Sequence, residues 1–329
     1  LLVNYYKHTL LYNIEIALKY LCLYSLIIWS TVLIFEFLLS VELFYQIPSF
    51  LLFPDNENLT ENVHAIFYNF RGYENKVLGI FRNPGFFWEP GALSGTVVMM
   101  YLMLLKNKQF RENFDTLFYL ICLTVISTFS IVGLVSIFLI FVYKLMTRFR
   151  LINFTLFSFQ TIIATALFTI TFQYIFSENS KLMDKINFQS DKVEMRKSGW
   201  ESNRLGSAIF LSDLIQEENT LFGLGFFTSY STLKNKLLLN GYRSDNSIGN
   251  GFFLLYLKFG AVFLLIILVF FYYKIYKFYN EIICSLFIFI LIVLQLQGEV
   301  WSNYNLIYLF LFLDSIIGYE KSNFLTQNK

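Results

Sequence analysis

Histidine, cysteine and charge are all scarce in this chain of 329 residues. Its only histidines are His8 and His64, which excludes a metal site built from histidines. The three cysteines lie far apart inside apolar runs, and no pair has the spacing of metal ligands. Charged residues make up 15% of the chain, whereas a soluble domain has about 25%. Low charge combined with 56% hydrophobic residues predicts an integral membrane protein.

Two phosphate-binding patterns are also missing. The chain has no Gly-rich loop of the Walker type and no Rossmann fingerprint. The energy for a reaction at the outer face would then come from the substrate itself, and we expect neither a cofactor nor a metal. Asp55-Asn-Glu57 has the composition of a metal-binding pair, but a Pro-Asp-Asn turn explains it equally well. The net charge of +2 gives no reason to expect a nucleic-acid partner.

Apolar runs of the length needed to cross a membrane, about 20 residues, recur along the chain. These runs cover residues 16–43, 86–105, 151–176, 251–273, 281–298 and 301–318. A further run, from Leu117 to Met146, is long for one crossing and short for two.

Basic residues on both sides of this further run predict how it folds. The residues before it are Lys106, Lys108 and Arg111, and those after it are Lys144, Arg148 and Arg150. Both groups are expected in the cytoplasm under the positive-inside rule, so the number of crossings between them must be even. The chain is therefore expected to turn near residues 127–130, between short helices at about 116–127 and 130–146. Eight crossings result, with both termini inside and the segments 44–85 and 177–250 outside.

The expected turn, Ser127-Thr-Phe-Ser130, lies below the outer surface because the first of the two helices is short. Irregular backbone at that depth requires protein or a wet cavity beside it, and we expect a polar cavity that opens outward. The predicted fold is an all-α bundle of about eight transmembrane helices. It forms a single domain, residues 1–329, with one large outer loop at 177–250.

A cation and a carboxylate flank the rigid segment Arg82-Asn-Pro-Gly-Phe-Phe-Trp-Glu-Pro-Gly91. Its two Pro-Gly pairs predict turns. Glu89 is expected at the start of a helix, where the helix dipole favours a carboxylate. The alternative is a simple turn at the membrane surface, whose Trp88 belongs to the interfacial aromatic belt.

The outer segment 177–250 contains two more candidates, Arg204 and Asp245. Two arginines, Arg82 and Arg204, suit a diphosphate because each guanidinium binds phosphate oxygens in a bidentate manner. Asp245 is a candidate general base for a sugar hydroxyl, although a turn also explains Asp245-Asn246. Further residues expected at the same site are Trp88, Arg243, Asn246 and Glu299.

Four segments, in order, resemble the motifs of bacterial O-antigen polymerases. Arg82–Ser94 resembles the family's Arg followed by Phe-aromatic-Glu-Pro-Gly. The others are Thr128-Phe-Ser130 with Val132-Gly133, Arg204 with Gly223-Leu-Gly225, and Ser244-Asp-Asn-Ser with Lys258-Phe-Gly260. Ile131 departs from the pattern, because the family usually has an arginine after the serine of the second motif.

The resemblance implies a glycosyltransferase of the GT-C type in the bacterial inner membrane. Its substrates would be undecaprenyl-diphosphate-linked oligosaccharides, both donor and acceptor, polymerised into O-antigen, capsule or exopolysaccharide at the periplasmic face. Related ligases carry a histidine where this chain has Asp245, which favours a polymerase. An O-antigen ligase and a flippase or transporter for lipid-linked sugars stay open as alternatives, as does a partner protein that sets chain length. Family members have more helices before the first motif, so a truncated or short form is expected.

Overall fold

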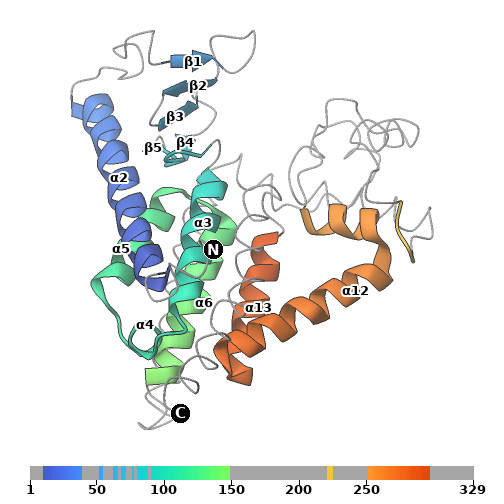
Figure 1. Ribbon diagram of the computed structural model, residues 1–329. Helices are drawn as coiled ribbons and strands as arrows, with labels where there is room; N and C mark the ends of the chain where they lie inside the picture. Colours follow the sequence, from blue (N-terminus) through green and yellow to red (C-terminus); the bar gives the residue numbers. More distant parts are fainter. Residues whose placement is uncertain are drawn as a thin grey trace, which may run out of the picture. The chain divides into compact units, whose positions relative to one another are not determined.

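The computed structural model describes residues 10–38, 52–54, 62–65, 68–71, 76–77, 80–87, 90–148, 221–224 and 251–296. Contacts along the chain divide it into two compact units, Leu1–Ile175 and Phe176–Lys329. Most of the described residues are helical (Figure 1). The single domain predicted from the sequence stays a prediction.

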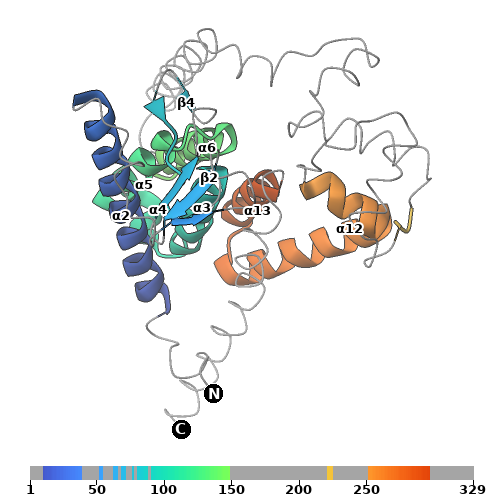
Figure 2. The same cartoon turned by 90° about the horizontal axis from the view of Figure 1, so that it is seen from above.

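The described part of the first unit is a bundle of helices beside short strands. Its helices are α2 (Leu10–Leu38), α3 (Pro90–Leu104), α4 (Lys108–Glu112), α5 (Thr116–Ser127) and α6 (Ile131–Arg148). Helix α3 contacts α2, α5 and α6, and its side chains are almost all buried. Seen from above, α3, α5 and α6 lie together beside α2 (Figure 2).

The turn predicted inside the long apolar run is confirmed. Helix α5 ends at Ser127 and α6 begins at Ile131, close to the boundaries expected from loop charge. Asp115 begins α5 as its N-cap, because its Oδ1 accepts a hydrogen bond of 2.7 Å from the Phe118 N–H. With 12 residues, α5 is about 18 Å long at 1.5 Å per residue. It is therefore shorter than the hydrocarbon core of a bilayer, which measures about 30 Å.

Short strands in the outer segment 44–85 add to the mostly helical fold and are not predicted from the sequence. β1 (Leu52–Pro54), β2 (Asn62–Ala65) and β3 (Tyr68–Arg71) form an antiparallel sheet, while β4 (Lys76–Val77) pairs with β5 (Ile80–Phe81). Apolar and polar residues alternate in Asn62-Val-His-Ala65, which is the two-residue period of a strand. His64 lies in β2, opposite Asn69.

The described part of the second unit contains α12 (Gly251–Tyr279) and α13 (Ile282–Leu296), which pack on each other. The ring of Phe289 contacts those of Phe271 and Tyr272, with centroids 6.4 and 5.6 Å apart. α12 runs past the predicted end of its apolar run and is broken at Gly260, whose φ is 74° and ψ 170°. The sequence predicted a continuous helix here.

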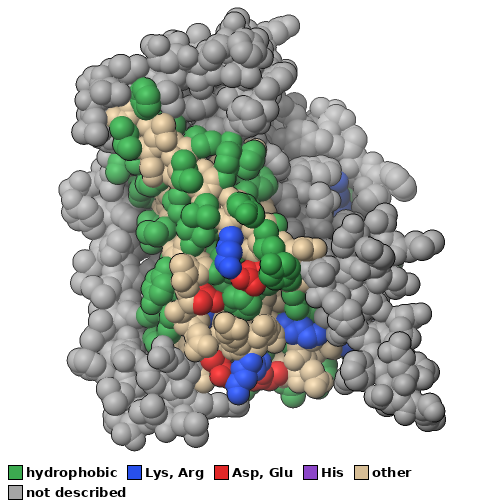
Figure 3. Space-filling model, turned by 60° about the vertical axis from the view of Figure 1, so that its left-hand side comes forward, with side chains coloured by type: hydrophobic (Ala, Val, Ile, Leu, Met, Phe, Trp, Pro, Cys, Tyr) green, Lys and Arg blue, Asp and Glu red, His purple; other side chains and the backbone are tan. Residues whose placement is uncertain are grey.

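Two of the described helices, α2 and α12, are long and apolar enough to cross a membrane. Large hydrophobic side chains on both are exposed, among them Ile27 and Ile34 of α2 and Leu265 and Val269 of α12. Figure 3 shows one face of the first unit. Hydrophobic side chains cover the upper part of this face, while charged side chains gather in its lower part. An apolar outer surface of this kind suits a lipid environment.

Candidate functional site

Arg82 begins the loop between β5 and α3, and we call residues 82–87 the Arg82 loop. The Arg82 Nε donates to the carbonyl of Thr128 at 2.9 Å, and its Nη2 donates to the carbonyl of Phe129 at 3.4 Å. Both carbonyls follow the last residue of α5. A cation is favoured there because the carbonyls at a helix C-terminus carry partial negative charge. The guanidinium therefore holds the end of α5.

Asn83 joins the same loop to the last residue of α5. Its backbone N–H donates to the Ser127 carbonyl at 2.9 Å, and its Nδ2 donates to the Ser127 Oγ at 2.9 Å. The Oδ1 of Asn83 accepts a hydrogen bond of 3.1 Å from the Gly85 N–H, which closes the loop on itself. Asn83 is completely buried, so these bonds are made away from solvent.

The first Pro-Gly pair of the loop forms the turn expected of it. The Phe87 N–H donates to the Pro84 carbonyl at 3.0 Å, and Gly85 has a φ of 56°. Side chains rarely adopt this left-handed conformation, which glycine reaches at little cost. A Cβ on Gly85 would also lie 3.2 Å from Leu93 and 3.4 Å from Ser25.

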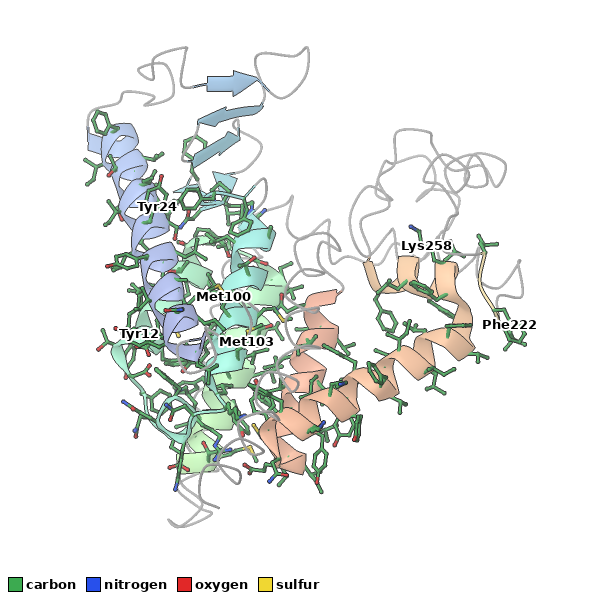
Figure 4. The ribbon with its side chains drawn as sticks, in the orientation of Figure 1. Tyr12, Tyr24, Met100, Met103, Phe222 and Lys258 are labelled. Atoms are coloured by element: carbon green, nitrogen blue, oxygen red, sulfur yellow. The ribbon has the colours of Figure 1, made fainter. Side chains whose placement is uncertain are left out.

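Helix α2 holds the loop from its other side. The Trp29 Nε1 donates to the Phe81 carbonyl at 2.7 Å. The ring of Tyr24, which is labelled on α2 in Figure 4, stacks on that of Phe86, with centroids 4.4 Å apart and planes inclined by 12°. The Arg82 loop is thus fixed between α2 and the end of α5.

The Ser/Thr turn, residues 127–130, satisfies its polar groups within the protein. The Ser127 and Thr128 hydroxyls each donate at 2.7 Å to a carbonyl of α5. The Thr128 Oγ1 also accepts a bond of 3.2 Å from the Ser130 N–H. Phe129 has a φ of 46°, a strained value for a residue with a side chain. Irregular backbone within the membrane requires either protein or a wet cavity beside it. Protein groups are observed beside this turn, and the predicted polar cavity stays a prediction.

Gly133 brings α6 into close contact with α3. A Cβ at this position would lie 2.8 Å from the Ser94 Cβ and 2.9 Å from the Val125 Cγ1. Only glycine permits this approach. Ser94 ends the first motif and Gly133 ends the second, so the two motifs meet both here and at the Arg82 loop.

The third and fourth motifs also meet, within the second unit. Gly223 lies directly against the break in α12, and a Cβ on it would lie 2.4 Å from the Lys258 carbonyl oxygen. A Cβ on Gly260 would lie 2.4 Å from the Gly223 nitrogen. Both glycines have positive φ, 75° and 74°. Neither position accommodates a side chain, because the atoms in the way belong to the backbone.

Lys144 is a buried cation, whereas its charge predicts exposure on the cytoplasmic side. The sequence predicts it within the helix 130–146 and, as a basic residue, at the cytoplasmic end; the structure confirms the helix but buries the side chain completely. Its Nζ donates to the carbonyls of Phe110 and Asn113. Three aromatic rings surround the ammonium group at 5.0–5.6 Å from their centroids, and they belong to Tyr101, Phe114 and Phe118.

Helical periodicity was the signal that could have found Lys144. The buried positions Ser136, Ile137, Ile140, Tyr143 and Lys144 follow the i, i+1, i+4, i+7, i+8 spacing of one helix face. The cation therefore continues the inward face of α6.

Arg82 is the one residue of the predicted site that lies within the described part of the chain. Trp88, Glu89, Arg204, Arg243, Asp245, Asn246 and Glu299 lie outside the described residues. Their convergence on one outer site stays a prediction. Within the described residues, no group of three or more His, Cys, Asp and Glu side chains is placed to hold a metal ion.

Comparisons of the chain with protein families, curated proteins and solved structures give no match. The resemblance to O-antigen polymerases therefore rests on the four motifs alone.

Proposed function

We propose that this protein is a membrane glycosyltransferase that polymerises undecaprenyl-diphosphate-linked oligosaccharide repeat units at the outer face of the bacterial inner membrane. The observation that carries the proposal is the pairing of the motifs. Arg82 of the first motif bonds to Thr128 of the second, 46 residues away in sequence. Gly223 of the third lies against Gly260 of the fourth. In each pair, segments that are distant in sequence lie in contact, as the parts of one functional site would.

The apolar helices support the membrane part of the proposal. Helices α2 and α12 have the length and composition of membrane spans. The hairpin of α5 and α6 supplies the even number of crossings that the flanking basic residues require. We propose eight crossings in total, with the segments 44–85 and 177–250 on the periplasmic side.

The proposed reaction is a single displacement at the anomeric carbon of the donor. The acceptor hydroxyl oxygen forms a bond to that carbon, and the bond from the carbon to the diphosphate oxygen breaks. Asp245 takes the hydroxyl proton. Polyprenyl diphosphate leaves with the bonding electrons, so no nucleotide is needed, and the configuration at the carbon is inverted.

Arginines are proposed to stabilise the leaving group. Arg204 binds the diphosphate and stabilises the charge that develops on it. Arg82 contributes to the same binding in the proposal, and Glu89 braces Arg82. Because Arg82 also donates to two carbonyls at the end of α5, it has a second role in positioning the Ser/Thr turn. Trp88, Arg243, Asn246 and Glu299 are proposed to contact the glycan or its diphosphate.

Deletion of the gene in its own host, followed by complementation with variants, tests this function. We expect wild type to restore a ladder of long glycans on a gel, and Arg204→Ala and Asp245→Asn to leave only single repeat units on the outer face. Lys108→Ala is the control, because it removes an exposed cation on α4, which the proposed topology puts on the inner side.

The rival functions predict other products. Loss of a flippase would strand repeat units on the inner side, whereas loss of a ligase would leave long polymer unattached to its lipid core. Full-length polymer from both Arg82→Ala and Arg204→Ala would show that the arginines do not bind the diphosphate.

A further inference from the structure

The turn of residues 221–224 is held against the break in α12 by its backbone, and we call it the Leu221 turn. The Leu224 N–H donates to the Leu257 carbonyl at 2.9 Å, and the Val262 N–H donates to the Leu221 carbonyl at 3.2 Å. In an unbroken helix the Val262 N–H would bond to Lys258, four residues earlier. The turn therefore supplies the bond that the break removes, and its position on the helix is fixed.

Two large apolar side chains project from this fixed turn. Leu221 is 55% exposed and Phe222 is 73% exposed. The Phe222 side chain points away from α12 in Figure 4, and the Lys258 side chain leaves the first half of the helix in another direction. Exposed Leu and Phe at the tip of a turn are costly in water, because each keeps a large apolar area in contact with solvent.

The rest of α12 shows which environment surrounds this end of the helix. From the break to Tyr273, the exposed residues are Val262, Phe263, Leu265, Ile266, Ile267, Val269, Phe270 and Tyr273, all of them apolar or aromatic. At 3.6 residues per turn they cover roughly 200° of the helix circumference. Only the remaining side, which includes Leu264, Phe271 and Ile275, is buried. A helix that is apolar on all sides is typical of a membrane span.

A single protein partner would cover one stripe of such a helix, about 100° wide, whereas lipid covers every exposed side. The Leu221 turn bonds directly to Val262, the first of the exposed apolar residues. Its apolar tip therefore continues the surface that lipid covers. Lys258 is partly exposed on the other side of the break, and its long side chain can place the ammonium at the headgroups while its carbons stay in apolar surroundings.

We propose that Leu221 and Phe222 insert into the acyl-chain region of the membrane and anchor the outer segment 177–250 to the lipid surface. The partner is the lipid bilayer itself. The inference rests on the membrane topology of the proposed function, and it adds the point at which the outer segment is attached. Arg204 precedes this anchor in the same segment, and the diphosphate of a lipid-linked sugar lies at the same surface.

Fluorescence quenching in vesicles tests the anchor. The full chain with Cys22→Ala, Cys122→Ala and Cys284→Ala carries Phe222→Cys labelled with an environment-sensitive fluorophore, in vesicles of phosphatidylcholine and phosphatidylglycerol. We expect lipids with nitroxide groups on their acyl chains to remove most of the emission, and aqueous iodide to remove little. Phe263→Cys on the apolar side of α12 is the lipid-facing control, and Lys108→Cys, whose side chain is 74% exposed on α4, is the water-facing control.

Each outcome has a definite meaning. If the nitroxide lipids quench the label at position 222 as strongly as they quench the label of Phe263→Cys, the anchor is supported. If iodide quenches it as strongly as the label of Lys108→Cys, the anchor is overturned. Protection from both quenchers also overturns it, because the tip would then be buried against protein. If the Phe222→Cys protein does not reconstitute, Leu221→Cys gives the same readings. The quenching assay does not measure polymer formation. The anchor and the proposed glycosyltransferase function can therefore be disproved independently of each other.

Discussion

Two roles proposed for Arg82 place different demands on one side chain. Binding of a substrate diphosphate concerns activity alone, whereas donation to the Thr128 and Phe129 carbonyls concerns the stability of the folded protein. A hydrogen bond from a charged donor contributes about 1.5–3 kcal/mol. The two roles can therefore be separated by measuring stability and activity on the same variants.

Arg82→Ala is predicted to lower the free energy of unfolding by about 2 kcal/mol, because the end of α5 loses a charged donor. Such a loss lowers the melting temperature by about 4 °C or more in a protein of moderate size, which a thermal scan in detergent measures. Lys108→Ala should show little change, since its contact with Glu112 is an exposed pair. A normal melting temperature with loss of polymer would leave substrate binding as the only role of Arg82.

Lys144→Met is predicted to destabilise the protein by about 3 kcal/mol, because the carbonyls of Phe110 and Asn113 lose their ammonium donor in a buried place. The change keeps most of the side-chain volume, so the lost bonds dominate over packing. Thermal unfolding compared with exposed Lys108→Met measures the difference. Equal melting temperatures would show that the buried ammonium contributes no net stability.

At the scale of elements, the break in α12 depends on two glycines from distant parts of the chain. Gly223→Ala and Gly260→Ala are each predicted to destabilise the second unit strongly, since the new Cβ would lie 2.4 Å from backbone atoms that cannot move aside. Positive φ at both positions adds strain. We expect little folded protein in size-exclusion profiles of both variants.

Leu265→Ala is the matched control for this pair. It removes an exposed side chain, 64% accessible, from the same helix and should leave the profile unchanged. A normal profile for Gly260→Ala would mean that α12 can form without its break, and the position of the Leu221 turn would then need another explanation.

Helix α6 is tied to the connection between α3 and α5 at one end of the bundle. Besides the bonds from Lys144, the Thr147 Oγ1 donates to the Arg111 carbonyl at 3.2 Å. The end of α6 and the connection that precedes α5 therefore lie on the same side, as two antiparallel helices joined by a tight turn must. Both ends of the α5–α6 hairpin thus lie on the side that the flanking basic residues assign to the cytoplasm, which supports the proposed topology of the whole molecule.

The whole-molecule prediction is that α4 lies inside the cell and the segment 44–85 outside. A membrane-impermeant maleimide should label Asn58→Cys in intact cells, and should label Lys108→Cys only after the membrane is opened. Both variants use the background without native cysteines. The physical reason is the cost of moving several basic residues across the membrane. Labelling of Lys108→Cys in intact cells would contradict the eight crossings.

Much of the local structure followed from residue chemistry. Pro84-Gly85 formed the expected turn, and the Ser/Thr turn fell where charge on both sides of the apolar run required it. The burial of Lys144 is not predicted, because a cation near the end of an apolar run is expected at the membrane surface. Its carbonyl and aromatic partners come from α3, α4, α5 and the connection between α4 and α5, which a single segment does not reveal.

The amino-acid sequence alone decides the apolar character of the helices, the places of the turns and the order of the four motifs, because these depend on residues close to one another in the chain. Contacts between distant segments needed the tertiary structure. Arg82 caps α5 from 46 residues away. Gly223 and Gly260 lie so close together that a Cβ on either one would clash with backbone atoms of the other segment. The local preferences of these residues do not identify the residues that they contact. Those contacts are selected by packing and by the hydrogen bonds that buried backbone groups require.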